Sequence, residues 1–249
     1  MSENNSQYDV IVIGAGVAGL YQLFKLRQLK LKALVIEAGD DVGGTWYWNR
    51  YPGARFDSES WSYGYSFSKE LFEEWDWPEH FAAQPDTLRY LNYVADKFDF
   101  RRDIKFDRRV EACVFDQHNN LWTVRTNTKE EYVARFLITA LGPLSAFTLP
   151  NIEGRETFKG PAYHTARWPH EEVDFSGKRV GIIGTGACAI QTIQTIAKDV
   201  AHLTVFQRSP NWAAPLNNSV ITEDEQKQIK QDFEKIFEQC RKTIACFLS

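Results

Sequence analysis

Two short glycine-rich stretches are the residues of this chain whose types and spacing point most directly to chemistry. Each follows a run of apolar residues and has the spacing Gly-x-Gly-x-x-Gly/Ala. The first consists of Gly14, Gly16 and Gly19, and the second of Gly184, Gly186 and Ala189. Glycines at this spacing let the backbone turn tightly and approach a pyrophosphate at the N-terminus of the following helix. The sequence therefore predicts two dinucleotide-binding sites.

The two stretches differ in the charge that follows the next apolar run. Glu37 ends the first of these runs, whereas Arg208 follows the second. A carboxylate accepts hydrogen bonds from a free ribose 2′-hydroxyl, whereas an arginine suits a 2′-phosphate. We therefore expect FAD or NAD in the first site and NADP in the second, which suggests electron transfer from NADPH to a flavin. The alternative for Arg208 is a solvated surface arginine.

The elements that must position these glycines follow a strand–helix–strand order in both halves. Apolar runs at 9–14 and 33–37 flank a helical pattern at 17–30, and a second such unit covers 178–206. These patterns predict an α/β fold with two Rossmann-like dinucleotide-binding domains, for FAD and NADP. The second is expected to be incomplete, since no third strand follows.

Three domains follow from these boundaries. They are an FAD-binding domain at 1–150, an NADP-binding domain at 151–215 and the start of a helical insertion at 216–249. The last segment opens with Thr222 and Glu225 at the spacing of a capping box, which predicts a C-terminal helical segment to about Lys242.

The bulk composition excludes several classes of protein. The 249 residues carry a net charge of −4, so nothing favours nucleic acid or an anionic membrane as partner. No apolar run has the length of a membrane span, and the polar start lacks the pattern of a signal peptide. The four cysteines form no CxxC pair, which favours a reduced cytoplasmic protein without a structural metal. Oligomeric state stays open.

A long loop at 43–57 is rich in aromatic residues and ends at Asp57. Gly44 and its neighbouring glycine permit close approach to a ligand, and Trp46 offers a flat face to a ring system. Asp57 is expected to be a buried carboxylate near a redox centre. The alternative is an aromatic mini-core beneath the loop.

A third segment, at 158–169, precedes the second glycine stretch and contains His164. A lone histidine is more often a packing or linker residue than a catalyst. Its place at the domain junction favours a hinge.

Together these segments resemble the Baeyer–Villiger monooxygenases. The family signature Phe-x-Gly-x-x-x-His-x-x-x-Trp-Pro is matched by Phe158, Gly160, His164, Trp168 and Pro169. Its pattern Gly-Gly-x-Trp, Tyr-Pro-Gly, Asp is matched by Gly43, Gly44, Trp46, Tyr51, Pro52, Gly53 and Asp57. The flavin-containing monooxygenases, which oxygenate nitrogen and sulfur, are the nearest alternative and lack the Trp-Pro ending. Disulfide reductases need a redox cysteine pair that this sequence lacks.

The resemblance implies an NADPH- and FAD-dependent monooxygenase that uses O₂ to convert ketones to esters or lactones through a flavin C4a-peroxide. It also implies roles for individual residues, with His164 in the linker and Asp57 facing the flavin ring as the candidate catalytic residues. The residues implied for FAD are Gly14, Gly16, Gly19, Glu37, Gly44, Thr45, Trp46, Asp57 and Tyr63. Those implied for NADPH are Gly184, Thr185, Gly186, Gln191, Arg208 and Ser209.

One departure from the family concerns its active-site arginine, which lies beyond position 249. We therefore expect an N-terminal portion of a longer protein that oxygenates poorly alone, with a nucleotide-binding module that has no oxygenase activity as the alternative. The substrate pocket, and with it the choice of ketone, lies outside these residues.

Overall fold

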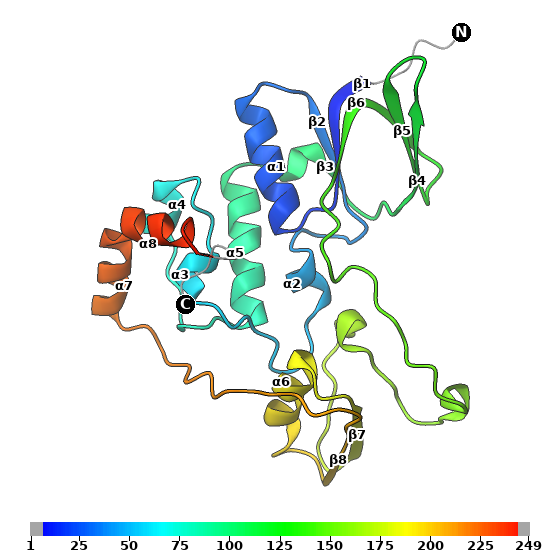
Figure 1. The fold of residues 1–249 in the computed structure, drawn as a ribbon, viewed down its shortest axis with the longest axis vertical. Helices are drawn as coiled ribbons and strands as arrows, with labels where there is room; N and C mark the ends of the chain where they lie inside the picture. Colours follow the sequence, from blue (N-terminus) through cyan, green and yellow to red (C-terminus); the bar gives the residue numbers. More distant parts are fainter. Residues whose placement is uncertain (1–6, 244–249) are drawn as a thin grey trace. The chain divides into compact units, whose positions relative to one another are not determined.

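A computed structural model describes residues 7–243, which form two compact units (Figure 1). The first comprises the described parts of Met1–Trp48 and Leu91–Ala162, and the second comprises those of Asn49–Tyr90 and Tyr163–Ser249. Each unit carries one of the two glycine stretches, so each is described by itself.

A six-stranded sheet in the order β3-β2-β1-β6-β5-β4 forms the centre of the first unit. Its first four members pair in parallel, while β4, β5 and β6 pair antiparallel. The strands are β1 (Gln7–Ile13), β2 (Ala33–Ile36), β3 (Ile104–Lys105), β4 (Val110–Asp116), β5 (Leu121–Thr126) and β6 (Glu131–Thr139). Ligands of such sheets bind at the carboxyl ends of the parallel strands, where the strand order reverses. That point lies at the end of β1, directly before Gly14.

Continuous apolar runs form the inner strands because both faces of the sheet are covered. Ile11 and Val35 are fully buried, and Leu20 and Leu23 of α1 are as well. The helical elements whose bounds fall in this unit are α1 (Val17–Gln28), α2 (Thr45–Trp48), η1 (Arg101–Asp103) and η2 (Arg155–Thr157), and α5 (Gln84–Lys97) ends in it. Helix α1 lies against β1 and β2, which places its N-terminus beside the glycine stretch (Figure 1).

The second unit has a smaller sheet of β7 (Arg179–Ile183) and β8 (His202–Phe206), which pair in parallel. Its helical elements include α3 (Ser60–Tyr63), α4 (Lys69–Glu74), η3 (Thr165–Arg167), α6 (Ala187–Ile196), α7 (Glu223–Gln231) and α8 (Phe233–Cys240). Side chains of α8 pack on Phe72 of α4 in an apolar cluster. β7, α6 and β8 form the predicted strand–helix–strand unit.

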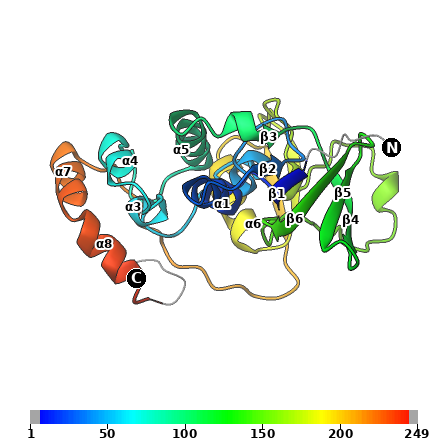
Figure 2. The ribbon, with the colours of Figure 1, turned by 90° about the horizontal axis from the view of Figure 1, so that it is seen from above.

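The α/β class is confirmed, and the C-terminal helical segment differs from its prediction in one respect. The predicted capping box is present: the Thr222 hydroxyl accepts from the Glu225 N–H at 3.3 Å, and Glu225 accepts from the Thr222 N–H at 2.8 Å. The helix then breaks at Asp232, so two consecutive helices, α7 and α8, replace the single one predicted (Figure 2). The break lets α8 turn Phe233 and Phe237 towards Phe72, and this burial outweighs the continuity of a polar helix.

Two absences hold for residues 7–243. No helix there is long and apolar enough to cross a membrane. No three His, Cys, Asp or Glu side chains within that range gather so as to hold a metal ion. Cys113, Cys188 and Cys240 form no disulfide, and Cys246 lies outside the described residues.

Candidate nucleotide-binding sites

The first glycine stretch turns under tight backbone constraint. Gly14 has φ +103°, and a Cβ built on it would lie 2.6 Å from the Ala140 carbonyl oxygen. A Cβ on Gly19 would lie 1.9 Å from the carbonyl oxygen of Gly14. Both positions therefore require glycine for the fold of the unit itself.

A second pair of glycines closes over the first stretch. The Gly43 N–H donates to the Ala15 carbonyl at 3.0 Å, and Gly44 has φ +53°. A Cβ on Gly44 would lie 2.7 Å from the Gly16 Cα, and one on Gly16 would lie 3.2 Å from the Gly44 Cα. The two loops thus leave no room for side chains between them.

The N-terminus of α1 suits an anion. Gly16 is the N-cap residue, and no side chain caps the helix there. Backbone N–H groups at a helix start bind ligand oxygens where no cap takes them, and the helix dipole favours negative charge. A dinucleotide pyrophosphate fits this cradle.

Glu37 lies at the end of β2 and is 5% exposed. One carboxylate oxygen accepts from the Ala15 N–H at 2.7 Å and the other from the Gly39 N–H at 2.8 Å. A carboxylate has about four acceptor positions, so capacity for ribose hydroxyls remains. Glu37 therefore fixes the glycine turn and presents an acceptor at the position where a ribose is read.

The residues that the sequence predicts to lie near the flavin divide between the two units. Thr45 and Trp46 begin α2 in the first unit, directly after Gly44, and Trp46 is buried. Tyr63 lies in the second unit, where it stacks on Phe56 with 4.4 Å between ring centroids and 8° between planes. Their roles towards FAD stay predictions.

Asp57 directly follows Phe56 in the second unit and is exposed. The expectation of a buried carboxylate is therefore wrong, because the buried side chain is that of its neighbour Phe56, which is 7% exposed. The role of Asp57 towards a flavin stays a prediction.

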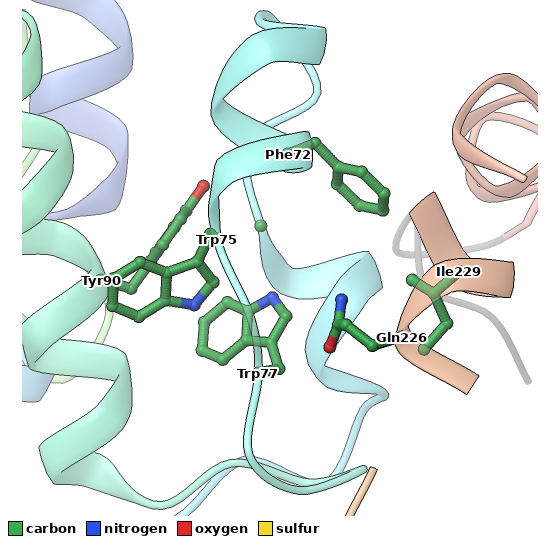
Figure 3. A pocket seen from close by; sticks show the side chains of 7 residues that line it. Phe72, Trp75, Trp77, Tyr90, Gln226 and Ile229 are labelled. Carbon is green, nitrogen blue, oxygen red and sulfur yellow. The ribbon is translucent and has the colours of Figure 1, made fainter. Parts of the chain in front are cut away.

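An aromatic cluster lies at 61–90, outside the loop at 43–57 for which an aromatic mini-core was the alternative. Figure 3 shows Trp75, Trp77 and Tyr90 packed together on one side of a small pocket, with Gln226 and Ile229 of α7 on the other side. The rings of Trp77 and Tyr90 lie 5.0 Å apart. Trp75 and Trp77 thus line a pocket beside α7.

The second glycine stretch is open where the first is crowded. Gly184 has φ +102°, yet a Cβ on Gly184 or Gly186 would meet nothing within 4 Å. Gly186 is the N-cap of α6, again with no side-chain cap. A pyrophosphate fits here as well, in space that the described residues leave free.

Two residues that sequence reasoning missed brace this loop. Gln207 donates to the Thr185 hydroxyl at 3.2 Å, and Asn211 donates to the Thr185 carbonyl at 2.9 Å. Arg208 and Ser209 lie between them and are exposed. Arg208 thus lies just after the end of β8, the position from which a residue of such a fold contacts the ribose.

Gln191, the remaining residue predicted for the second site, lies on α6 and uses its amide within the protein. Its Oε1 accepts from the Tyr51 hydroxyl at 2.8 Å, and its Nε2 donates to the Arg55 carbonyl at 3.0 Å. No simple sequence signal links positions 140 residues apart.

His164 is the N-cap of η3. Its Nδ1 accepts from the Ala166 N–H at 3.1 Å. Burial, aided by the positive charge of Arg167, lowers the pKa of His164 from its usual value. The His164 ring therefore caps this turn, and its role in a hinge stays a prediction.

Comparisons with known proteins agree with these features. Residues 11–246 match the pyridine nucleotide-disulphide oxidoreductase family. The 2-oxo-Delta(3)-4,5,5-trimethylcyclopentenylacetyl-CoA monooxygenase of Pseudomonas putida is 47% identical over 245 residues, which cover 96% of this chain and 45% of that protein. A Baeyer-Villiger monooxygenase of Pseudooceanicola batsensis is 43% identical over 97% of this chain and 44% of its own length.

One relative and one solved structure add to this. The phenazine N-monooxygenase PhzNO1 of Lysobacter antibioticus is 43% identical over 99% of this chain and 46% of its own length. The crystal structure of OTEMO complexed with FAD and NADP matches with a TM-score of 0.93 and 47% identity, over 96% of this chain and 46% of that one. This chain spans about half the length of the relatives it matches. The resemblance to Baeyer–Villiger monooxygenases drawn from the motifs is confirmed.

Proposed function

The chain belongs to the pyridine nucleotide-disulphide oxidoreductase family and is a homologue of the Baeyer–Villiger monooxygenases. We therefore propose that it is the nucleotide-binding part of an NADPH- and FAD-dependent monooxygenase. The proposed reaction converts a ketone to an ester or lactone, with one atom of O₂ inserted and the other released as water, while NADPH is oxidised to NADP⁺. The whole protein, its small-molecule ketone and its cytoplasmic location belong to this proposal.

One observation carries it: two glycine cradles are followed by residues of opposite charge. Glu37 is buried with its carboxylate beside the first cradle, and Arg208 is exposed after the second. This pairing favours FAD in the first unit and NADPH in the second. A disulphide reaction is disfavoured, since the sequence has no cysteine pair at CxxC or CxxxxC spacing.

When bound, the flavin would supply the hydride and oxygen chemistry, as cofactors do. The residues of this chain supply binding and orientation. Gly14, Gly16 and Gly44 shape the cradle that would hold the pyrophosphate, and Glu37 would accept hydrogen bonds from the ribose. In the second unit Gly184 and Gly186 leave room for the NADPH pyrophosphate, and Arg208 would pair with the 2′-phosphate.

A related family member suggests a second candidate, oxygenation of a nitrogen atom. The relative named phenazine N-monooxygenase is as similar to this chain as the Baeyer–Villiger monooxygenase compared above, at 43% identity each. The cofactor sites would be the same for both reactions, so they do not separate the two.

The experiment measures absorption and products together. The purified protein is incubated with FAD and desalted, and NADPH oxidation is then followed with and without a panel of ketones and aromatic amines. Ester or lactone supports the main proposal, and N-oxide supports the second. Hydrogen peroxide as the sole product supports the nucleotide-binding module without oxygenase activity, and a colourless protein contradicts FAD binding by this chain.

A further inference from the structure

The contacts of Gln191 point to a role that differs from nucleotide binding. We propose that Gln191 is a positioning residue that fastens the segment bearing Asp57 to α6, so that nucleotide bound at the second glycine stretch stabilises that segment. This inference rests on the proposed NADPH site for its second half only. The fastening itself is a property of the nucleotide-free protein.

The amide of Gln191 is engaged at both ends by the same segment. Its Oε1 accepts from the Tyr51 hydroxyl at 2.8 Å and from the Arg55 N–H at 3.4 Å, while its Nε2 donates to the Arg55 carbonyl at 3.0 Å. One side chain therefore holds both peptide groups flanking Arg55, as a neighbouring strand would. An amide whose donor and acceptor are both used in this way has little left for a ligand.

Tyr51 is suited to be a permanent donor. Its side chain is 8% exposed, and burial together with the neighbouring Cys188 raises the pKa of its phenol. The hydroxyl therefore stays protonated at physiological pH and donates to Gln191. Removal of either partner leaves a polar group in a partly buried place, which is costly.

The backbone of the segment also lies directly on α6. Gly53 has φ +81°, and a Cβ there would lie 2.2 Å from the Thr195 hydroxyl and 2.6 Å from the Gln191 carbonyl. In Figure 1 the segment passes beside α6. Only glycine permits this approach, so the contact has a backbone part and a side-chain part.

The segment is fixed again on its other side, close to Asp57. The Arg55 guanidinium forms an ion pair with Glu79 at 3.0 Å and donates to the Phe81 carbonyl at 3.2 Å. Phe56 stacks on Tyr63. The exposed Asp57 therefore follows two residues whose positions are set, and one of them is set by Gln191.

Helix α6 joins this fastening to the second site. Gly186, the N-cap of α6, is five positions before Gln191, little more than one helical turn. A nucleotide that orders the first turn of α6 thereby orders Gln191, and through it the backbone at Arg55. By thermodynamic reciprocity, the fastened segment favours the nucleotide-bound helix.

The test uses hydrogen exchange of the Arg55 amide, which is itself a donor to Gln191. The variants are Gln191→Met, Tyr51→Phe and a control, Gln194→Met, whose residue lies exposed on the same helix. Gln191→Met keeps the length of the side chain and removes its amide. Without nucleotide, we expect exchange at Arg55 to be about tenfold faster in Gln191→Met, since about 1.4 kcal/mol of hydrogen bonding corresponds to tenfold. The control stays within about twofold of the parent protein.

Added NADP⁺ completes the test. We expect it to slow exchange over 51–57 in the parent and in Gln194→Met but not in Gln191→Met, while its dissociation constant changes less than about fivefold in that variant. A loss of affinity with unchanged exchange at Arg55 would make Gln191 a nucleotide ligand and overturn the proposal.

Two further results keep the outcomes distinct. If NADP⁺ does not bind even the parent protein, the proposed NADPH site is wrong. The exchange rates at Arg55 measured without nucleotide still test whether Gln191 fastens the segment. If Gln191→Met unfolds, Tyr51→Phe provides the milder variant. Suppose that Gln191→Met unfolds and that Tyr51→Phe folds with an unchanged exchange rate at Arg55. This result would count against the fastening, because the unfolding of Gln191→Met would then come from lost packing.

Discussion

The two glycine stretches share one spacing but meet different surroundings. In the first, Cβ atoms on Gly14 and Gly19 would collide with backbone oxygens at 2.6 and 1.9 Å. In the second, Cβ atoms on Gly184 and Gly186 would meet nothing within 4 Å. The first loop therefore needs its glycines for its own fold. The second needs Gly184 for its φ of +102° and Gly186 for the space a ligand would take.

The acidic and basic residues follow the same division. Glu37 is buried and accepts two backbone N–H groups of its own loop. Arg208 is exposed, and its loop is braced by Gln207 and Asn211 instead. The first site is thus built into the unit's core, while the second is held by a few side chains. Mutations at equivalent positions should have unequal effects.

The largest difference is expected between Gly19→Ala and Gly186→Ala. Gly19→Ala forces a Cβ against the Gly14 oxygen, so it should destabilise the protein by about 3 kcal/mol, the upper range for overpacking. Gly186→Ala changes an N-cap with open space around it and should cost less than about 1 kcal/mol. Urea unfolding followed by tryptophan fluorescence measures both. Equal losses would remove the distinction between the loops.

Glu37→Gln tests the buried carboxylate. The variant keeps the shape but turns one acceptor into a donor that faces an N–H group, either that of Ala15 or that of Gly39. We expect a loss of about 1–3 kcal/mol in unfolding free energy and weaker FAD binding. The NADP⁺ dissociation constant serves as the internal control and should stay the same. A stable variant with normal FAD affinity would show that Glu37 neither fixes the glycine turn nor binds the FAD ribose.

Asn211→Ala tests the side-chain brace of the second loop. It removes the 2.9 Å hydrogen bond to the Thr185 carbonyl, which should cost about 0.5–1.5 kcal/mol. The substitution should weaken NADP⁺ binding and leave the amount of bound FAD unchanged. Isothermal titration with NADP⁺ measures it. Loss of flavin together with NADP⁺ affinity would mean that the two loops do not differ in the way described.

The smallest effect concerns His164. Its pKa is lowered in the folded protein by burial and by Arg167, so the unfolded chain takes up its proton first. The stabilising cap is therefore complete above the ordinary histidine pKa of about 6.5 and is lost as pH falls through the lower folded value. His164→Asn, which also caps helices, should reduce the dependence of stability on pH below about 6.5. Unchanged pH dependence would exclude His164 as its source.

The parts predicted from sequence are those that depend on neighbours along the chain. The apolar runs at β1 and β2, the glycine turns and the Thr222–Glu225 capping box are local patterns, and the structure has them. The break at Asp232 was not predictable, because it is set by packing of α8 on Phe72.

The site residues divide in the same manner. The positions of Glu37 and Arg208 are predictable because each residue comes directly after, or two positions after, the end of a strand, β2 and β8 respectively. The contact of Gln191 with Tyr51 joins residues 140 positions apart, and the exposure of Asp57 depends on Phe56 taking the buried place instead. No local pattern encodes either. These long-range contacts are where the structure adds most to the sequence.

The central claim is that residues of opposite charge, Glu37 and Arg208, select the nucleotide bound at each glycine stretch. Arg208→Ala tests this claim most directly. Dissociation constants for NADP⁺ and NAD⁺ are measured with the parent protein and the variant, both loaded with FAD. The account predicts that NADP⁺ binding weakens by about 1.5–3 kcal/mol, the range for hydrogen bonds to charged groups, while NAD⁺ binding changes little. Equal losses for both nucleotides would contradict a 2′-phosphate role for Arg208.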